Sequence, residues 1–215
     1  MESIPHFENM QQKQKEWDTV VRSLEHVVDG LGMPIDSNII ETLAGFNVNH
    51  FHTISSCGGH TDAERIRLPY IHFAPPEKPH YRYENEASFR KQIAEKYQLN
   101  ESDIDQDINK EADREYWKAM DVQQETPEWR EWYSKLVDLE GQIDKLLEHF
   151  YSQNNFAGGV FHTRGIGGAV VMEPIEREKI FDDLVDDQKK IELVKSYQQQ
   201  IEKIGTYLKE LYFST

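Results

Sequence analysis

Apolar residues recur at helical spacing along several stretches of this chain, which predicts amphipathic helices. The first helix is expected over residues 8–28, where six apolar residues fall on one side: Trp17, Val20, Val21, Leu24, Val27 and Val28. Gly30 and Pro34 end this helix. Asp36 or Ser37 then caps a short second helix, whose apolar side carries Ile39, Ile40 and Leu43.

Shorter apolar runs predict two pairs of strands. Residues 51–54 and 68–73 form the first pair, and a long polar loop joins them. Residues 158–163 and 169–173 form the second pair, which is joined by the glycine-rich segment 164–168. Long polar loops inside compact domains more often carry function than short ones. The loop of the first pair is therefore the first place to look for a site.

Helical spacing returns in the second half of the chain. We expect residues 80–150 to form a helical insertion, in which Thr126 and Pro127 start a long helix, and a final long helix to run from about residue 180 to the C-terminus. The fold class is therefore α+β. A small, mainly antiparallel sheet of two strand pairs is covered by long helices within a single domain, residues 1–215. Coiled-coil pairing of the long helices, within one chain or in a homo-oligomer, is the alternative for the insertion.

Composition narrows the classes of partner. Lys and Arg number 24 against 39 Asp and Glu, a formal net charge of −15, which disfavours nonspecific binding to nucleic acid. One cysteine excludes an internal disulfide framework and suits a reducing compartment. No apolar stretch approaches the roughly 20 residues that cross a bilayer, and no signal peptide is predicted. We expect a soluble, cytoplasmic protein that does not enter a membrane.

The densest set of reactive side chains follows the first predicted strand. It contains the single cysteine, two serines, two glycines and a histidine, namely Ser55, Ser56, Cys57, Gly58, Gly59 and His60. A glycine-rich turn can present backbone N–H groups to an anion, which either serine can also hydrogen-bond. Cys57 is a candidate nucleophile, with His60 as its catalytic partner. The alternative is a buried cysteine in an ordinary glycine turn.

Histidines on the predicted strands and beside this turn are candidate zinc ligands together with Cys57. They are His50, His52, His60, His72 and His162. Cys57 and His60 supply half of a zinc motif, and no second close pair follows. His60 and His72 rank above the others because they flank the same loop. The alternative is that the histidines are scattered over strands and loops, so the metal and the cofactor stay open.

Arg164 opens the second glycine-rich segment, close to His162. A dinucleotide-binding turn leads into a helix and a P-loop ends in Lys-Ser/Thr, whereas a strand follows this segment. We therefore expect a hairpin turn. Within it, a guanidinium held beside glycines suits a carboxylate or a phosphate, so Arg164 and His162 join the candidate ligand-binding residues.

Three segments together resemble a group of uncharacterised bacterial and phage proteins: residues 32–36, 53–60 and 69–71. That group carries a Ser-Cys-x-Gly-His motif after a short helix and strand, and has a similar glycine hairpin and long terminal helix. Residues 40–59 also resemble the start of the wybutosine-tRNA methyltransferase family, whose motif reads Ser-Ser-Cys-Ser-Gly-Arg. This chain differs from that motif at Gly58 and His60, and it lacks a basic surface suited to tRNA.

Three functions follow from these features. The first is a pocket for a small anionic or nucleotide-like ligand, formed by the block at residues 55–60, His72 and the glycine-rich hairpin with Arg164. The resemblance to phage proteins is compatible with a sequestering or regulatory role for such a pocket. The second is a cysteine- or metal-dependent hydrolase or transferase. The third is an interaction protein that forms oligomers through its long helices.

Overall fold

The chain divides into two compact units in the computed structural model. The first consists of Met1–Ala74 and Leu136–Thr215, and the second of Pro75–Lys135. The predicted helical insertion covered residues 80–150, whereas the apolar stripe of the long helix continues into the core of the first unit beyond Leu136. The structure describes residues 4–62, 66–154, 160–175 and 186–215.

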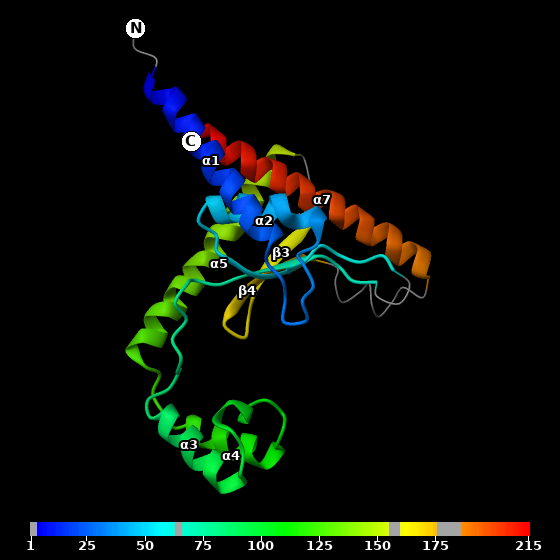
Figure 1. Cartoon of the computed structure of the whole chain (residues 1–215). Coiled ribbons are helices and arrows are strands. Elements are labelled where there is room, and N and C mark those ends of the chain that lie inside the picture. Colours follow the sequence, from blue (N-terminus) through cyan, green and yellow to red (C-terminus); the bar gives the residue numbers. More distant parts are fainter. Residues whose placement is uncertain (1–3, 63–65, 155–159, 176–185) are drawn as a thin grey trace. The chain divides into compact units, whose positions relative to one another are not determined.

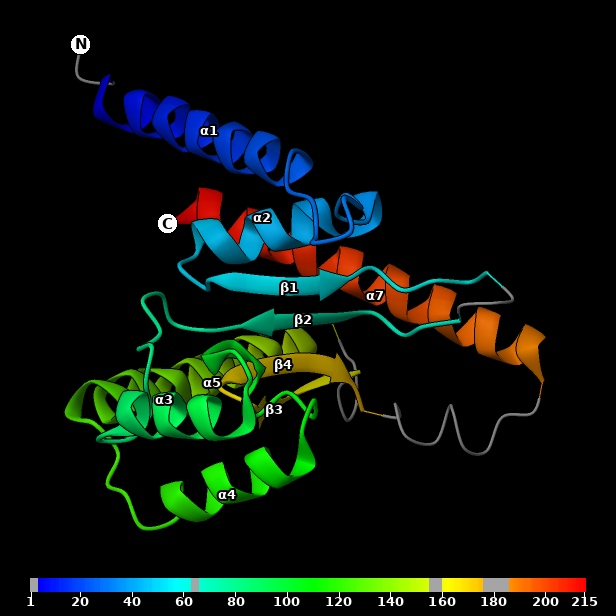
Figure 2. The same ribbon diagram turned by 60° about the horizontal axis from the view of Figure 1, so that its bottom comes forward.

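A four-stranded antiparallel sheet forms the centre of the first unit. Its strands are β1 (Thr53–Cys57), β2 (Tyr70–Phe73), β3 (Phe161–Ile166) and β4 (Ala169–Pro174). Their order across the sheet is β1-β2-β4-β3, so the two hairpins join through β2 and β4, and β1 and β3 are the edges (Figure 2). The predicted α+β class and the two strand pairs are confirmed.

β1 and β3 each end three residues later than predicted, and β1 and β2 each begin two residues later than predicted. β1 continues through Ser55 and Ser56 to Cys57, because these residues pair with β2, so the predicted turn begins later. β3 continues to Ile166, and only Gly167 and Gly168 form the turn to β4. Both have positive φ, +55° and +85°, as a two-residue hairpin turn requires. Residues 158 and 159, where this strand was predicted to start, lie outside the described residues.

Helices cover one face of the sheet, among them the second half of α5 (Pro127–Gln153), where Asp144 accepts a hydrogen bond from Thr163 of β3. On α2 (Ile40–Val48), the ring of Phe46 meets that of Phe73 in β2 with centroids 4.8 Å apart. On α7 (Asp187–Ser214), the ring of Tyr197 meets that of Phe161 in β3 at 5.8 Å. Aromatic pairs at these separations bury large apolar areas, so this face is the core side of the sheet. Figure 1 shows α2 and α7 side by side.

The first helix, α1 (Ile4–Glu25), ends earlier than its apolar stripe predicted. Val27 and Val28 are 45% and 58% exposed rather than part of the core. The carboxylate of Asp29 accepts hydrogen bonds from the backbone N–H groups of Leu31 and Met33, both at 2.8 Å. These bonds stabilise a tight loop, which competes with continued helix. α1 packs on α2 and α7 through the buried ring of Trp17.

The second unit is helical. It contains α3 (Glu86–Tyr97), a short 3-10 helix η2 (Glu101–Asp103), α4 (Lys110–Met120) and the first turns of α5 (Pro127–Gln153). Its small core lies between α3 and α4 and consists of Ile93, Ala94, Ile104, Ala112, Tyr116 and Met120. None of the helices in the described part of the chain is both long and apolar enough to span a lipid bilayer.

Candidate functional site

The end of β1 turns sharply against the segment that precedes α2. Gly58 follows Cys57, and its backbone N–H donates a hydrogen bond of 2.7 Å to Oδ2 of Asp36. Asp36 was predicted as a candidate helix cap, but its side chain makes no capping hydrogen bond to the 3-10 helix η1 (Ser37–Ile39) that starts there. The carboxylate is instead directed to the end of β1.

Three side chains that bind metals meet at this turn. One ligand atom each from Asp36, Cys57 and His60 lies within 4.8 Å of the other two. Nε2 of His60 is 3.8 Å from Oδ2 of Asp36, and both side chains are about one-third exposed. Cys57 is buried. Two ligand atoms bound to one tetrahedral zinc ion lie about 3.3–3.8 Å apart, so small side-chain movements bring the set to coordination distance.

Polar side chains hold the backbone of this turn in place. The side-chain amide of Asn38 donates to the carbonyl oxygen of Gly58 at 2.9 Å. The amide of Gln198, on α7, donates to the carbonyl oxygens of Gly58 and Gly59 at 3.2 and 2.9 Å. The turn is thus fixed from two sides by segments far away in the sequence. Such support is typical of residues that orient the ligands of a site.

The two glycines at this turn are needed for different reasons. A Cβ on Gly58 would lie 2.2 Å from Oδ1 of Asn38 and 2.9 Å from Cβ of Asp36. Gly59 has φ of +84°, a conformation that side chains rarely adopt. Gly58 therefore allows Asp36 to approach the end of β1, and Gly59 allows the chain to turn towards His60.

The environment of Cys57 favours a metal ligand over a free nucleophile. Burial raises the pKa of the thiol above its usual value, and the charge of Asp36 raises it further. A hydrogen bond from the backbone of Gly59 and the charge of Arg67 oppose this shift without cancelling it. At neutral pH the thiol is protonated, whereas the thiolate is the reactive form. A bound cation would displace this proton, because metals bind the thiolate.

At Gly58, the backbone N–H that was predicted to bind an anion already has a hydrogen-bond partner. This N–H is bonded to the carboxylate of Asp36, which brings a negative charge into the turn. An anion that approached the same N–H would meet that carboxylate. A cation would instead be attracted by it, and the sulfur and imidazole nitrogen beside it are the ligand types that zinc selects.

Most of the other predicted residues lie on one face of the sheet, opposite the core side. The register places Ser55 beside His72, and His72 and Arg164 on either side of Val171. Residues directly opposite each other in an antiparallel sheet share a face. Ser56 pairs with Ile71 and so belongs to the core side.

The two glycine-rich turns lie at opposite ends of this sheet. Gly58 follows the last residue of β1. The Gly167–Gly168 turn leads into the start of β4, where Val170 pairs with Phe73, and Phe73 pairs with Thr53, the first residue of β1. In addition, β1 and β3 are opposite edges, about 14 Å apart at the usual strand spacing. The structure therefore does not bring the glycine-rich hairpin to the Cys57–His60 turn.

Arg164 and His162 engage a carboxylate of their own hairpin. Nε of Arg164 donates a short hydrogen bond to Oε1 of Glu173, and Nε2 of His162 is 3.9 Å from the same oxygen. The carboxylate of Glu173 is buried at 3% exposure. A buried charge needs such a partner, so the guanidinium of Arg164 balances a carboxylate of the protein itself.

The remaining predicted histidines lie outside the Asp36–Cys57–His60 cluster. His50 has φ of +67° just after α2, where it helps to end the helix. Nδ1 of His52 is 3.2 Å from the carbonyl oxygen of Ala74. The ring of His72 packs against that of Tyr70, with centroids 5.0 Å apart. The cluster of three ligand types described above includes none of these rings.

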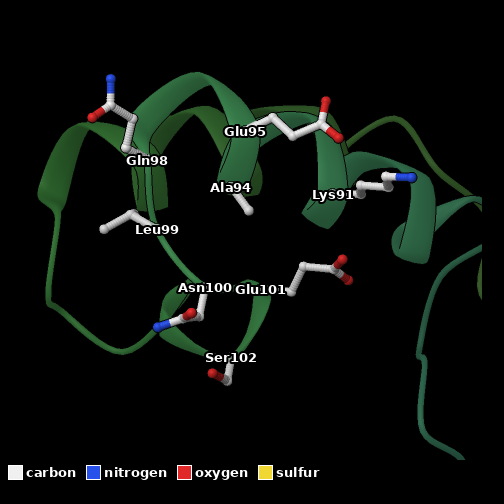
Figure 3. A pocket seen from close by; sticks show the side chains of 8 residues that line it. All are labelled: Lys91, Ala94, Glu95, Gln98, Leu99, Asn100, Glu101 and Ser102. Carbon is white, nitrogen blue, oxygen red and sulfur yellow. The ribbon is translucent and has the colours of Figure 1, made fainter.

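A separate open hollow of about 580 Å³ lies in the second unit, between the end of α3 and η2 (Figure 3). The side chain of Ala94 points into it from α3. Its lining consists of Lys91, Ala94, Glu95, Gln98, Leu99, Asn100, Glu101 and Ser102. No predicted site residue is among them, and the lining holds no aromatic ring, histidine or cysteine. We therefore place the candidate site at Asp36, Cys57 and His60.

Sequence reasoning considered Asp36 only as a helix cap and within a resemblance, and it missed Asn38, Arg67 and Gln198. No local signal marks these residues, because each reaches the turn from another segment. The one available clue to Asp36 was its position two residues after the chain-stopping segment Gly32-Met33-Pro34, since a residue in such a place is held in a defined position. No protein-family model, curated protein or solved structure matches the chain.

Proposed function

We propose that this protein binds a divalent transition metal, zinc before others, through Asp36, Cys57 and His60, and that the metal holds a small anionic ligand. The observation that carries this proposal is the meeting of a carboxylate, a thiol and an imidazole within 4.8 Å. Mixed sulfur, nitrogen and oxygen ligands are those that zinc accepts in a tetrahedral site. The backbone support from Asn38 and Gln198 favours a preformed site.

The number of ligands indicates what such a site does. Structural zinc sites have four protein ligands, whereas sites that bind water or a substrate have three and keep one position open. In the described part of the chain the cluster has three members. The proposed site therefore binds an exogenous ligand, and an anion is the natural one, because the metal attracts negative charge.

Two activities share this chemistry. Tight binding without turnover would make the protein a sequestering or regulatory protein, whereas activation of a bound water would make it a hydrolase. The buried, protonated state of Cys57 disfavours the cysteine-dependent enzyme that acts without metal. A lone thiol ligand suits a reducing, cytoplasmic setting.

Metal analysis of the purified full-length chain tests the proposal, followed by titration with Zn²⁺ against a chromophoric chelator. We expect one zinc per chain. The ligand variants Asp36→Asn, Cys57→Ala and His60→Gln should each lose about 100-fold or more in zinc affinity. Removing a residue that only hydrogen-bonds to a metal ligand already lowers metal affinity about 10–100-fold.

The matched control is His52→Gln. It removes an exposed histidine at the opposite end of the same strand, outside the cluster, and should leave the zinc affinity unchanged. Zinc that binds Cys57→Ala as tightly as the unmodified chain would show that the ion occupies another place. Absence of binding in the unmodified chain would refute the site directly.

A further inference from the structure

Arg67 lies directly opposite His60 in an isolated antiparallel bridge between β1 and β2. The N–H of each residue donates to the carbonyl oxygen of the other, both at 2.9 Å. Two such reciprocal bonds define a hydrogen-bonded antiparallel pair, whose side chains leave the backbone on the same face. Because the imidazole of His60 points to Asp36, the guanidinium of Arg67 leaves on the side of the proposed metal site.

The position of Arg67 beside this cluster is fixed by its backbone pairing with His60, one of the three proposed ligands. Arg67 is exposed, and in the part of the chain that the structure describes no carboxylate forms an ion pair with it. Arg164, in contrast, is bound to Glu173. Among the residues that the structure describes, Arg67 is therefore the guanidinium with donors available at this site.

The charges of the metal, its ligands and Arg67 indicate what kind of ligand the metal-bound site attracts. A divalent cation bound by the carboxylate of Asp36 and the thiolate of Cys57 forms a neutral complex, because His60 coordinates as a neutral ring. Arg67 then adds one positive charge beside it. In a chain with a net charge of −15, this local excess is what lets an anion approach.

We propose that the ligand of this site carries an oxyanion group, a phosphate or a carboxylate, which is bound by the metal and by Arg67 together. This inference rests on the proposed metal site and names its second contact. The planar guanidinium presents paired N–H donors that match two oxygens of such a group. A phosphate keeps a third oxygen for the open metal position, whereas a carboxylate would give one oxygen to Arg67 and the other to the metal. Arg67 is a residue that sequence analysis did not select.

The test uses full-length protein loaded with Co²⁺, whose visible absorption responds to a change of its ligands. Inorganic phosphate and acetate are titrated separately into the unmodified protein and into Arg67→Ala and Arg67→Lys. We expect Arg67→Ala to bind Co²⁺ within about threefold of the unmodified protein. It should lose about tenfold or more in affinity for the preferred oxyanion, because a charge-assisted hydrogen-bond pair is lost. The oxyanion affinity of Arg67→Lys should lie between those of the unmodified protein and Arg67→Ala.

The control is Arg22→Ala, which removes an exposed arginine on α1 whose Nε donates to the backbone carbonyl of Asp18. It should leave both affinities unchanged. An equal oxyanion affinity in Arg67→Ala, with Co²⁺ bound, would overturn the role of Arg67 and leave the metal site standing. Failure of the unmodified protein to bind Co²⁺ would overturn the metal site and this inference with it. The probe that binds more tightly identifies the group as phosphate or carboxylate.

Discussion

At the scale of single residues, the candidate site depends on a position without a side chain. Gly58 is surrounded so closely by Asn38 and Asp36 that a methyl group has no room. Its N–H also orients the carboxylate of Asp36 at 2.7 Å. A hydrogen bond of this kind fixes a ligand before the metal arrives, which lowers the cost of ordering it on binding.

Gly58→Ala should therefore weaken zinc binding about tenfold or more and lower the free energy of unfolding by about 1–3 kcal/mol. The added methyl group must displace Asn38 or Asp36, since it would lie 2.2 and 2.9 Å from their atoms. Chelator competition and urea denaturation measure the two effects.

Gly30→Ala is the matched control for this substitution, because nothing lies within 4 Å of the added Cβ there. It should change neither quantity appreciably. A Gly58→Ala protein that keeps full zinc affinity would mean that Asp36 does not need its present position to bind the metal.

A second residue-scale feature is the buried carboxylate of Glu86 in the second unit. It accepts hydrogen bonds from the backbone of Arg82 and Tyr83, from Nε of Arg90 and from the hydroxyl of Tyr116. Burial alone raises its pKa, but these donors outweigh burial, and the net effect lowers the pKa below the usual value of 4.5. The ionised form therefore stabilises the folded second unit.

Glu86→Gln should lower the free energy of unfolding at pH 7 by about 2–4 kcal/mol, because a buried charged network loses its acceptor. A pKa that is lower in the folded than in the unfolded state stabilises above the unfolded value and loses this effect as pH falls through the folded value. The difference between the two proteins should therefore shrink below about pH 4.

Denaturation curves recorded across pH measure this difference. The control is Glu131→Gln, which removes an exposed carboxylate that pairs with Lys135 one helical turn away, and it should have little effect at any pH. A stability difference between Glu86→Gln and the unmodified chain that is constant from pH 3 to pH 7 would show that charge at Glu86 is not the cause.

At the scale of elements, two helices determine where the site turn lies. α7 carries Gln198, which bonds to the carbonyl oxygens of Gly58 and Gly59, and α2 follows the segment with Asp36 and Asn38. These helices approach closely at small residues. Gly205 of α7 lies against the backbone of Thr42, whose hydroxyl donates to the carbonyl oxygen of Ile201 at 2.9 Å.

Gly205→Ala should lower the free energy of unfolding by about 1–3 kcal/mol, since its Cβ would lie 3.0 Å from Cα and 3.1 Å from N of Thr42. Backbone atoms cannot move aside as a flexible side chain does, so the helices must separate. Thermal and chemical denaturation measure the effect.

Gly141→Ala in α5 makes the same change in a helix where nothing lies within 4 Å of the added Cβ. It should instead stabilise by about 0.5–1 kcal/mol, because alanine favours helix over glycine. If Gly205→Ala were also stabilising, helix propensity would outweigh the close α2–α7 contact at this position.

At the scale of the whole molecule, the site joins two stretches that the sheet alone does not connect. Asp36 precedes α2, whereas Cys57 and His60 lie at the end of β1. A metal that binds all three would tie the helical layer of the first unit to its sheet edge. Such a metal binds the folded chain in preference to the unfolded one, so it adds to stability by mass action.

Zinc at about 100 times its dissociation constant should therefore stabilise the folded chain by about 2.7 kcal/mol, and a chelator should reverse the gain. Thermal denaturation with and without zinc measures it. Asp36→Asn keeps the size and the acceptor for the N–H of Gly58, but should lose this stabilisation. An equal gain in Asp36→Asn would place the stabilising ion elsewhere.

The amino-acid sequence by itself determined the local structure of this protein. The spacing of apolar residues is sufficient to predict the helices and the two strand pairs, because an element with one buried face must repeat apolar residues at its own period. The Gly167–Gly168 turn was also predictable, since two residues with positive φ favour glycine. The block around Cys57 and His60 was recognisable as a candidate site, because so many reactive groups stand together there.

Only the tertiary structure decided which residues complete that site. Asp36 and Gln198 approach the turn from segments that no local spacing connects to it. The strand order β1-β2-β4-β3 likewise places Arg164 at the far edge, beside Glu173. Contacts of this kind arise from how faces of helices and sheet pack against each other. Periodicity reports that a face is buried, but it does not report against which partner.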